Sequence, residues 1–169
     1  MEIKIDKNTP YQIAEFAYQK ADEATKEKMR TFGKRYFLQD RDFLQISIDE
    51  FLNLCSGDLS DFKNATGKAF DYFFAMAFFE FTNELIKILE KLKVNESLLT
   101  KEQRQVNSRL PQMSFAKSIM CFCQDFFKLQ DFASVGKLKL AEFLLAKEKQ
   151  YVEDLAHTLI AHISRNKTE

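Results

Sequence analysis

The sequence predicts an all-α protein, a single-domain bundle of about five to six helices around a long phenylalanine-rich central helix. The 169 residues include only four glycines and two prolines, and this scarcity of turn-forming residues favours few, long elements. Apolar residues recur at helical rather than alternating spacing along most of the chain. A composition of 46% hydrophobic and 30% charged residues is typical of a globular domain.

The two ends of the chain are expected to lie outside this bundle. Residues 1–8 predict a short extended arm, because Ile3 and Ile5 alternate with charged neighbours as in a strand. A lone strand has no partner in a helical chain, so the arm would stay unpaired or pair with another chain. Residues 9–163 are expected to form the helical domain, and residues 164–169 a frayed polar tail.

The first helix is expected to begin at Thr9-Pro10, as helix cap and first helical residue. Its apolar side continues to about Phe32, where Gly33 would end it.

Three helix starts carry capping signals. Ser47-Ile48-Asp49-Glu50 and Thr100-Lys101-Glu102-Gln103 both match the capping box, in which the first side chain accepts the amide three residues on. The first box opens a short helix to about Leu54. Ser114 is expected to cap a further helix.

The central helix is predicted from about Ser60 to Lys93, and Gly67 is a point where it would begin or kink. Six phenylalanines lie between Phe70 and Phe81. Because this stretch is apolar on nearly all sides, it must be buried on several faces.

The final helix is predicted from Leu140 to about Ile163, after one helical turn at Asp131 to Gly136. We expect one inward apolar stripe along it: Phe143, Leu144, Val152, Leu155, Leu159 and Ile163.

A short internal echo links two of these helix starts. Residues 46–52, Ile-Ser-Ile-Asp-Glu-Phe-Leu, resemble residues 138–144, Leu-Lys-Leu-Ala-Glu-Phe-Leu. Either the chain contains a duplication, or two amphipathic helix starts are alike because first turns favour acidic residues.

The charge balance argues against polyanionic partners. There are 25 basic and 25 acidic residues, and no segment is a basic tract. Nucleic-acid binding and anionic membrane surfaces both require clustered positive charge, so we expect neither as a partner. The first residues form no apolar run, and three cysteines are too few for a disulfide scaffold, so a cytoplasmic location is expected.

The residues usually found in metal and catalytic sites occur at unsuitable spacings. Cys121 and Cys123 would face opposite sides of a helix, and His157 and His162 would lie about 140° apart. No nucleophile elbow or glycine-rich phosphate loop is present. We therefore expect no cofactor, no bound metal and no enzymatic activity.

One metal-binding alternative stays open, a helical bundle with carboxylate and histidine ligands. Glu80 and Glu84 lie one turn apart, and Glu153 lies four residues before His157. A di-iron bundle would need a second carboxylate–histidine motif.

The sequence therefore favours a non-enzymatic helical interaction module, an adaptor or assembly factor that binds a protein partner or itself. Two alternatives are a structural subunit of a homo-oligomer and an accessory protein similar, in size and neutral helical style only, to chaperone-like proteins of bacteriophage tail assembly. The candidate interaction surface consists of Phe74, Met76, Phe78, Phe79, Ile3 and Ile5.

Overall fold

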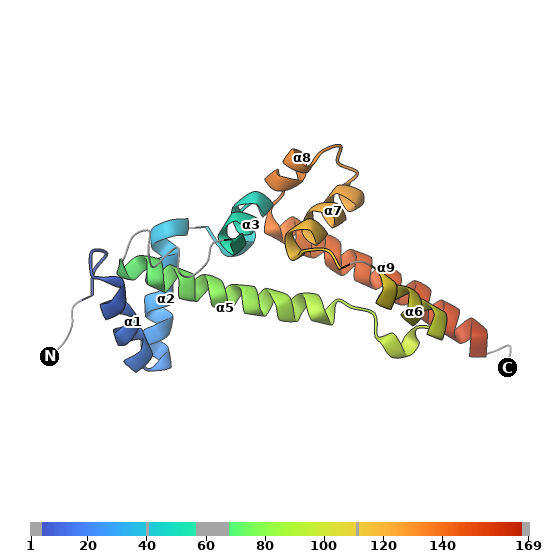
Figure 1. The fold of residues 1–169 in the computed structure, drawn as a ribbon, viewed down its shortest axis with the longest axis horizontal. Coiled ribbons are helices and arrows are strands. Elements are labelled where there is room, and N and C mark those ends of the chain that lie inside the picture. Colours follow the sequence, from blue (N-terminus) through green and yellow to red (C-terminus); the bar gives the residue numbers. More distant parts are fainter. Residues whose placement is uncertain (1–4, 40, 57–67, 111, 167–169) are drawn as a thin grey trace. The chain divides into compact units, whose positions relative to one another are not determined.

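The computed structural model describes residues 5–39, 41–56, 68–110 and 112–166, and the description below concerns these residues. They are helical, with no strand among them (Figure 1). The α-helices are α1 (Tyr11–Lys20), α2 (Glu23–Leu38), α3 (Ile48–Ser56), α5 (Ala69–Lys91), α6 (Lys101–Arg109), α7 (Phe115–Phe127), α8 (Phe132–Lys137) and α9 (Leu140–Asn166), and η1 (Phe43–Gln45) and η2 (Glu96–Leu98) are short 3₁₀ helices.

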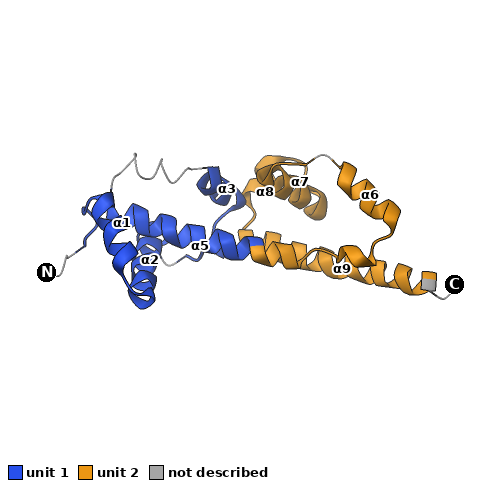
Figure 2. Ribbon diagram, turned by 60° about the horizontal axis from the view of Figure 1, so that its bottom comes forward, with its two compact units in different colours: residues 1–86 blue, residues 87–169 orange. Residues whose placement is uncertain are grey.

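The prediction of an all-α protein is confirmed, but the helices of the described residues outnumber the five to six expected. Part of the predicted central helix, residues 60–67, lies outside the described residues, and α5 accounts for its remainder. The chain divides into two compact units, residues 1–86 and 87–169, coloured separately in Figure 2. The single helical domain over residues 9–163 stays a prediction.

The first predicted helix is two helices, which is a correction. The chain leaves helical geometry at Ala21, which has extended dihedral angles, and α2 begins after Asp22. The Asp22 carboxylate accepts a hydrogen bond of 2.8 Å from the backbone N–H of Thr25. An aspartate three residues before such an amide is a strong helix cap, and this signal was present in the sequence.

Gly33 does not end the helix, which is a second correction, because α2 continues to Leu38. The glycine is instead buried where α2 lies against α5. A β-carbon at this position would overlap the backbone of Phe73 and Phe74. Glycine is needed here for the close approach of two helix backbones.

The core of unit 1 is an aromatic cluster along α5. Phe73 and Phe74 are each 2% exposed. Phe74 contacts the rings of Phe37, Phe43 and Phe78, with centroid separations of 4.7, 5.9 and 6.4 Å. The prediction that the phenylalanine-rich helix is buried on several faces is therefore confirmed for this stretch.

Two of the predicted capping signals are confirmed in full. Thr100 and Gln103 form both hydrogen bonds of the capping box, 3.1 and 2.9 Å long. Ser114 accepts the amide of Lys117 at 3.3 Å. Such bonds involve residues three apart, so their geometry follows from the sequence alone.

Unit 2 packs α7, α8 and the start of α9 around one another. Its buried side chains include Ile119 and Cys123 of α7, Val135 of α8, and Leu140 and Phe143 of α9. Helix α9 continues through Asn166, so residues 164–166 are helical rather than part of a frayed tail.

The echo between residues 46–52 and 138–144 has a structural counterpart in each unit. In both segments the Glu-Phe-Leu triplet lies in the first turn of a helix, α3 or α9. Phe51 and Phe143, the matching phenylalanines, are 0% and 1% exposed. Each segment follows a short helical turn that an aspartate caps, Asp42 before η1 and Asp131 before α8. The two halves of the chain therefore share one local design.

Candidate interaction surface

One side of α9, the orange-to-red helix of Figure 1, exposes a row of apolar side chains. Leu145 is 66% exposed, Val152 63% and Ile163 53%. Scattered exposed apolar residues are ordinary, whereas a contiguous row of them makes this side of α9 a candidate interaction site. We call this row the outer seam; its members, all exposed, are Leu145, Lys149, Val152, Ala156, Leu159 and Ile163.

The outer seam has the spacing of a coiled-coil interface. From Leu145 to Ile163 its positions advance by alternating steps of four and three residues, which is the a/d pattern of a heptad repeat. At 100° per residue the six positions stay within a band of about 80° on the helix surface. A second helix laid along this band would cover every member.

The opposite side of α9 packs against its own unit. Phe143 and Ala146 are buried, and the Phe143 ring meets Phe122 of α7 edge-on at a centroid separation of 5.8 Å. Leu144 and Leu155 are half-buried. Helix α9 thus has two apolar faces, and only one of them is covered.

The predicted inward stripe of α9 is wrong for three of its six residues. Val152, Leu159 and Ile163 are exposed rather than inward. The apolar residues of α9 spread too widely around the helix to form one stripe: some lie on an inner face, some in the outer seam, and Ile160, 63% exposed, lies in neither. The four-and-three spacing in the sequence was the signal that could have identified the outer seam.

An apolar cavity of about 230 Å³ adjoins the N-terminal end of the outer seam. Phe126 and Phe127, at the end of α7, line it together with Leu145 and Lys149, which belong to the seam. The Lys149 ammonium lies 5.8 Å from the centroid of the Phe126 ring, within cation–π range. The seam and this cavity form one continuous surface within unit 2.

The surface proposed from the sequence has a different composition in the structure. Phe74 and Phe78 are buried, at 2% and 9% exposure, in the aromatic cluster of unit 1. Met76 is half-buried, and Phe79 is 54% exposed. Of these four side chains on α5, Phe79 alone is exposed.

The predicted surface also included two residues of the N-terminal arm, Ile3 and Ile5. Ile5 is half-buried and packs against the core cluster that includes Tyr11 and Phe73, while Ile3 lies outside the described residues. The backbone folds into a turn after Ile5, because Thr9 N–H donates to the Asp6 carbonyl at 3.1 Å. Ile5 also lines an apolar cavity of about 330 Å³ in unit 1.

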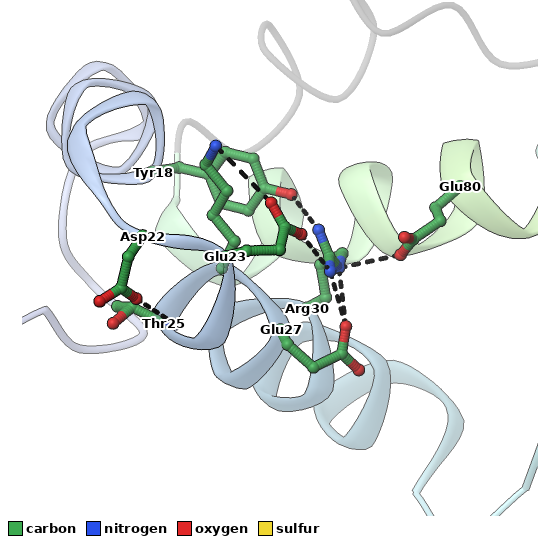
Figure 3. Close-up of polar contacts among 8 residues, drawn as sticks. Tyr18, Asp22, Glu23, Thr25, Glu27, Arg30 and Glu80 are labelled. Carbon is green, nitrogen blue, oxygen red and sulfur yellow. Dashed lines mark hydrogen bonds and ion pairs between the residues drawn. The ribbon is translucent and has the colours of Figure 1, made fainter.

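Arg30 is the one basic residue among the buried side chains of the described part, and carboxylates surround it (Figure 3). It pairs with Glu23 at 2.8 Å and Glu27 at 2.6 Å on its own helix, and with Glu80 of α5 at 2.9 Å. Its guanidinium also donates to the Tyr18 hydroxyl at 2.9 Å. Burial would lower the pKa of Arg30, but hydrogen bonds to Glu27, Glu23 and Tyr18 raise it above its ordinary value.

A polar groove of about 500 Å³ runs past this cluster. Several of the charged residues that line it are paired: Arg30 with Glu27 and Glu80, and Lys34 with Asp42 at 3.0 Å. Arg41, which also lines it, pairs with Glu50 outside the groove. A charged ligand would have to break these pairs, so the groove is better explained as a structural contact among α2, η1 and α5.

Neither Cys55 nor Cys123 has the environment of a reactive cysteine. Desolvation raises the pKa of Cys55 and of Cys123 to about 11, whereas catalytic thiols have a lowered pKa. Within the described ranges, no three His, Cys, Asp or Glu side chains cluster closely enough to hold a metal ion. Glu80, a candidate ligand from the sequence, is engaged by Arg30.

The segment from Asp131 to Glu142, which spans α8 and the start of α9, has part of the sequence pattern of a helix–loop–helix calcium site. Asp131, Gly136 and Glu142 occupy positions 1, 6 and 12 of the twelve-residue loop. Positions 3 and 5, which normally supply oxygen ligands, hold Ala133 and Val135. The donor set is therefore insufficient for calcium.

The two carboxylates of this segment cap helices instead. Asp131 accepts the amide of Ser134, and Glu142 accepts the amide of Lys139, each at 2.7 Å. The matching glutamate of unit 1, Glu50, accepts two hydrogen bonds of 3.1 Å from the guanidinium of Arg41. Glu50 matches the position whose carboxylate binds calcium bidentately in a helix–loop–helix calcium site, and in this protein Arg41 contacts that carboxylate.

Among the described helices, none is long and apolar enough to span a bilayer. No protein-family model, curated protein or solved structure matches this chain.

Proposed function

We propose that this protein is a non-enzymatic helical interaction module, an adaptor or assembly factor, which binds a partner helix along the outer seam of α9. The observation that carries the proposal is the exposed heptad row itself. Its apolar members, from Leu145 to Ile163, are exposed at a spacing that suits helix-on-helix packing.

The cavity beside the seam supports the same role. Phe126 and Phe127 line a recess at one end of the row, and a docked helix could insert an apolar side chain there. Buried apolar anchors of this kind supply most of the binding energy in protein interfaces. Phe122 lies one helical turn before Phe126 on α7, and the two rings stack. The Lys147 ammonium lies 3.9 Å from the centroid of the Phe122 ring, so the wall of the recess is held in place.

The chemistry of the rest of the chain is consistent with a binding role. The pKa of the Cys55 and Cys123 thiols is raised, and several charged groups of the polar groove are paired with one another. The apolar surface of α9 is one feature that local packing leaves unexplained.

Photocrosslinking from the seam tests this function in the source cell. A benzophenone amino acid at Leu159 should give a discrete covalent adduct, and the added substitution Val152→Glu should abolish it. The same probe at Val106 of α6, which is 59% exposed but lies outside the seam, is the matched control. Identical adducts from Leu159 and Val106, or adducts insensitive to Val152→Glu, would contradict the proposal.

A further inference from the structure

The outer seam is complementary to a copy of itself when two α9 helices run antiparallel. If Leu145 of one chain lies level with Ile163 of a second copy, each of the six seam positions lies opposite a seam position of the other helix, and each such pair forms one layer of the interface. Lys149 then faces Leu159 of the second copy, and Val152 faces Ala156 of the second copy. Every layer recurs across a two-fold axis, as an isologous interface requires. Large and small side chains alternate in the central layers, which favours close packing.

The charges along α9 favour this antiparallel direction. Residues 140–154 contain four acidic residues and two lysines, a net charge of −2. Residues 155–166 contain one arginine and two histidines but no acidic residue. Antiparallel pairing sets the acidic half of each helix beside the basic half of the other. Parallel pairing sets the two acidic halves side by side and the two basic halves side by side.

Lys149 provides an independent argument about direction. It is the one charged member of the seam, and a polar residue in a heptad core commonly selects the arrangement of helices. In a parallel pair, two Lys149 ammonium groups would share one layer. In the antiparallel pair they lie about 15 Å apart along the axis, and each can keep its contact with Phe126.

From these observations we infer that the partner of the outer seam is a second copy of this chain, packed antiparallel as a two-fold dimer. This inference rests on the proposed function, because it names the occupant of the same surface. The paired stretch from Leu145 to Ile163 is about 27 Å long. An interface of this length is small, so the dimer should dissociate in the micromolar range, with a Kd of about 1–100 μM.

Sedimentation equilibrium of the purified full chain tests the dimer directly. Over about 1–300 μM the mass should rise from one chain to two. Val152→Glu with Leu159→Glu should raise the Kd at least about 10-fold, while Val106→Glu should leave it unchanged. Circular dichroism of each variant should show unaltered helix content, because all three positions are exposed. A monomer at every concentration would overturn the inference.

Crosslinking tests whether the two α9 helices of the dimer run antiparallel. In a Cys55→Ser background, Leu145→Cys with Ile163→Cys should give a covalent dimer with a short bis-maleimide, and neither single variant should. A dimer formed by Leu145→Cys alone would indicate parallel helices and would overturn the antiparallel arrangement.

The two proposals fail separately. If the purified chain is monomeric but the benzophenone at Leu159 joins it to a different protein in the cell, self-association is wrong and the interaction module stands. If neither a dimer nor a seam-dependent adduct forms, both proposals are wrong.

Discussion

Gly33 of α2 lies directly against the backbone of Phe74 of α5, with no room for a β-carbon between them. Two helices of unit 1 therefore touch backbone to backbone at this point, with the aromatic cluster beside it. The contact explains why a residue that is unfavourable inside helices occupies the interior of α2.

Gly33→Ala should destabilise the protein by about 1–3 kcal/mol, because the added methyl group forces the two backbones apart. Helix propensity alone predicts the opposite sign, a gain of about 1 kcal/mol. Urea unfolding followed by circular dichroism measures the difference. Thr31→Ala, at an exposed position of the same helix, is the control and should be neutral or slightly stabilising. Stabilisation by Gly33→Ala would show that the helices do not meet there.

Phe74→Ala should cost about 3–5 kcal/mol, because it leaves a cavity among the rings of Phe37, Phe43 and Phe78. Phe79→Ala, five residues further along α5, should cost less than about 0.5 kcal/mol, because that ring is 54% exposed. Chemical denaturation of the two variants side by side tests the orientation of α5. Equal losses would mean that the faces of this helix are misassigned.

Arg30→Met should destabilise unit 1 by about 1–3 kcal/mol. The methionine retains apolar packing but leaves the carboxylates of Glu27 and Glu80 without their shared cation. The loss of stability is moderate because these carboxylates are largely exposed and solvent screens their charges. Lys26→Met, which removes a long pair of 3.9 Å with the exposed Glu23, is the control and should have a much smaller effect on thermal unfolding. A loss for Arg30→Met no larger than that for Lys26→Met would contradict a structural role for the cluster.

Stability should fall in alkali because of Tyr72. Desolvation, with smaller contributions from Glu15, Tyr11 and Tyr18, raises the pKa of Tyr72 to about 12, whereas an unfolded tyrosine has a pKa of about 10. Between these values the unfolded chain loses a proton that the folded chain keeps. The stabilisation is therefore complete below pH 10 and is lost as pH rises towards 12.

Unfolding free energies measured from pH 8 to 11.5 should show this decline, and Tyr72→Phe should make it shallower. The thiol of Cys123 contributes in the same direction, since its pKa is also raised, so the decline should not vanish. Tyr36→Phe, at a position that is 53% exposed, is the control and should retain the full slope. An unchanged slope in Tyr72→Phe would contradict the burial of its hydroxyl.

Calcium should not stabilise the protein. The segment from Asp131 to Glu142 lacks oxygen ligands at Ala133 and Val135, so the melting temperature should be equal in about 1 mM calcium and in chelator. Ala133→Asp, at an exposed position, supplies one missing carboxylate without disturbing the buried Val135 and serves as the matched comparison. A calcium-dependent rise in melting temperature of the natural chain would show that other groups complete the site.

The sequence predicted those features whose cause lies within a few residues. The caps at Thr100 and Ser114 belong to this class, because donor and acceptor are three residues apart. The burial of α5 also followed from composition, since six phenylalanines in one helix cannot all remain in water.

Features that depend on distant parts of the chain were not predictable in the same way. Phe74 and Phe79 are chemically identical, and only the packing of α2 and η1 beside α5 makes one buried and the other exposed. In the sequence, Gly33 cannot be distinguished from a glycine that ends a helix; only the position of α5 shows that it permits a close contact between two helices. On α9 the spacing of the outer seam was visible, but its exposure depends on which side α7 covers.

The capping roles of Asp131 and Glu142 affect how the evolution of this segment should be read. Selection for helix starts alone would preserve Asp131 and Glu142, and selection for packing would preserve Gly136, which is buried within α8. If relatives of this chain keep these three residues while positions 133 and 135 drift among apolar types, the shared pattern records a common scaffold, not a common ligand. Conservation at positions 131, 136 and 142 is then no evidence of calcium dependence.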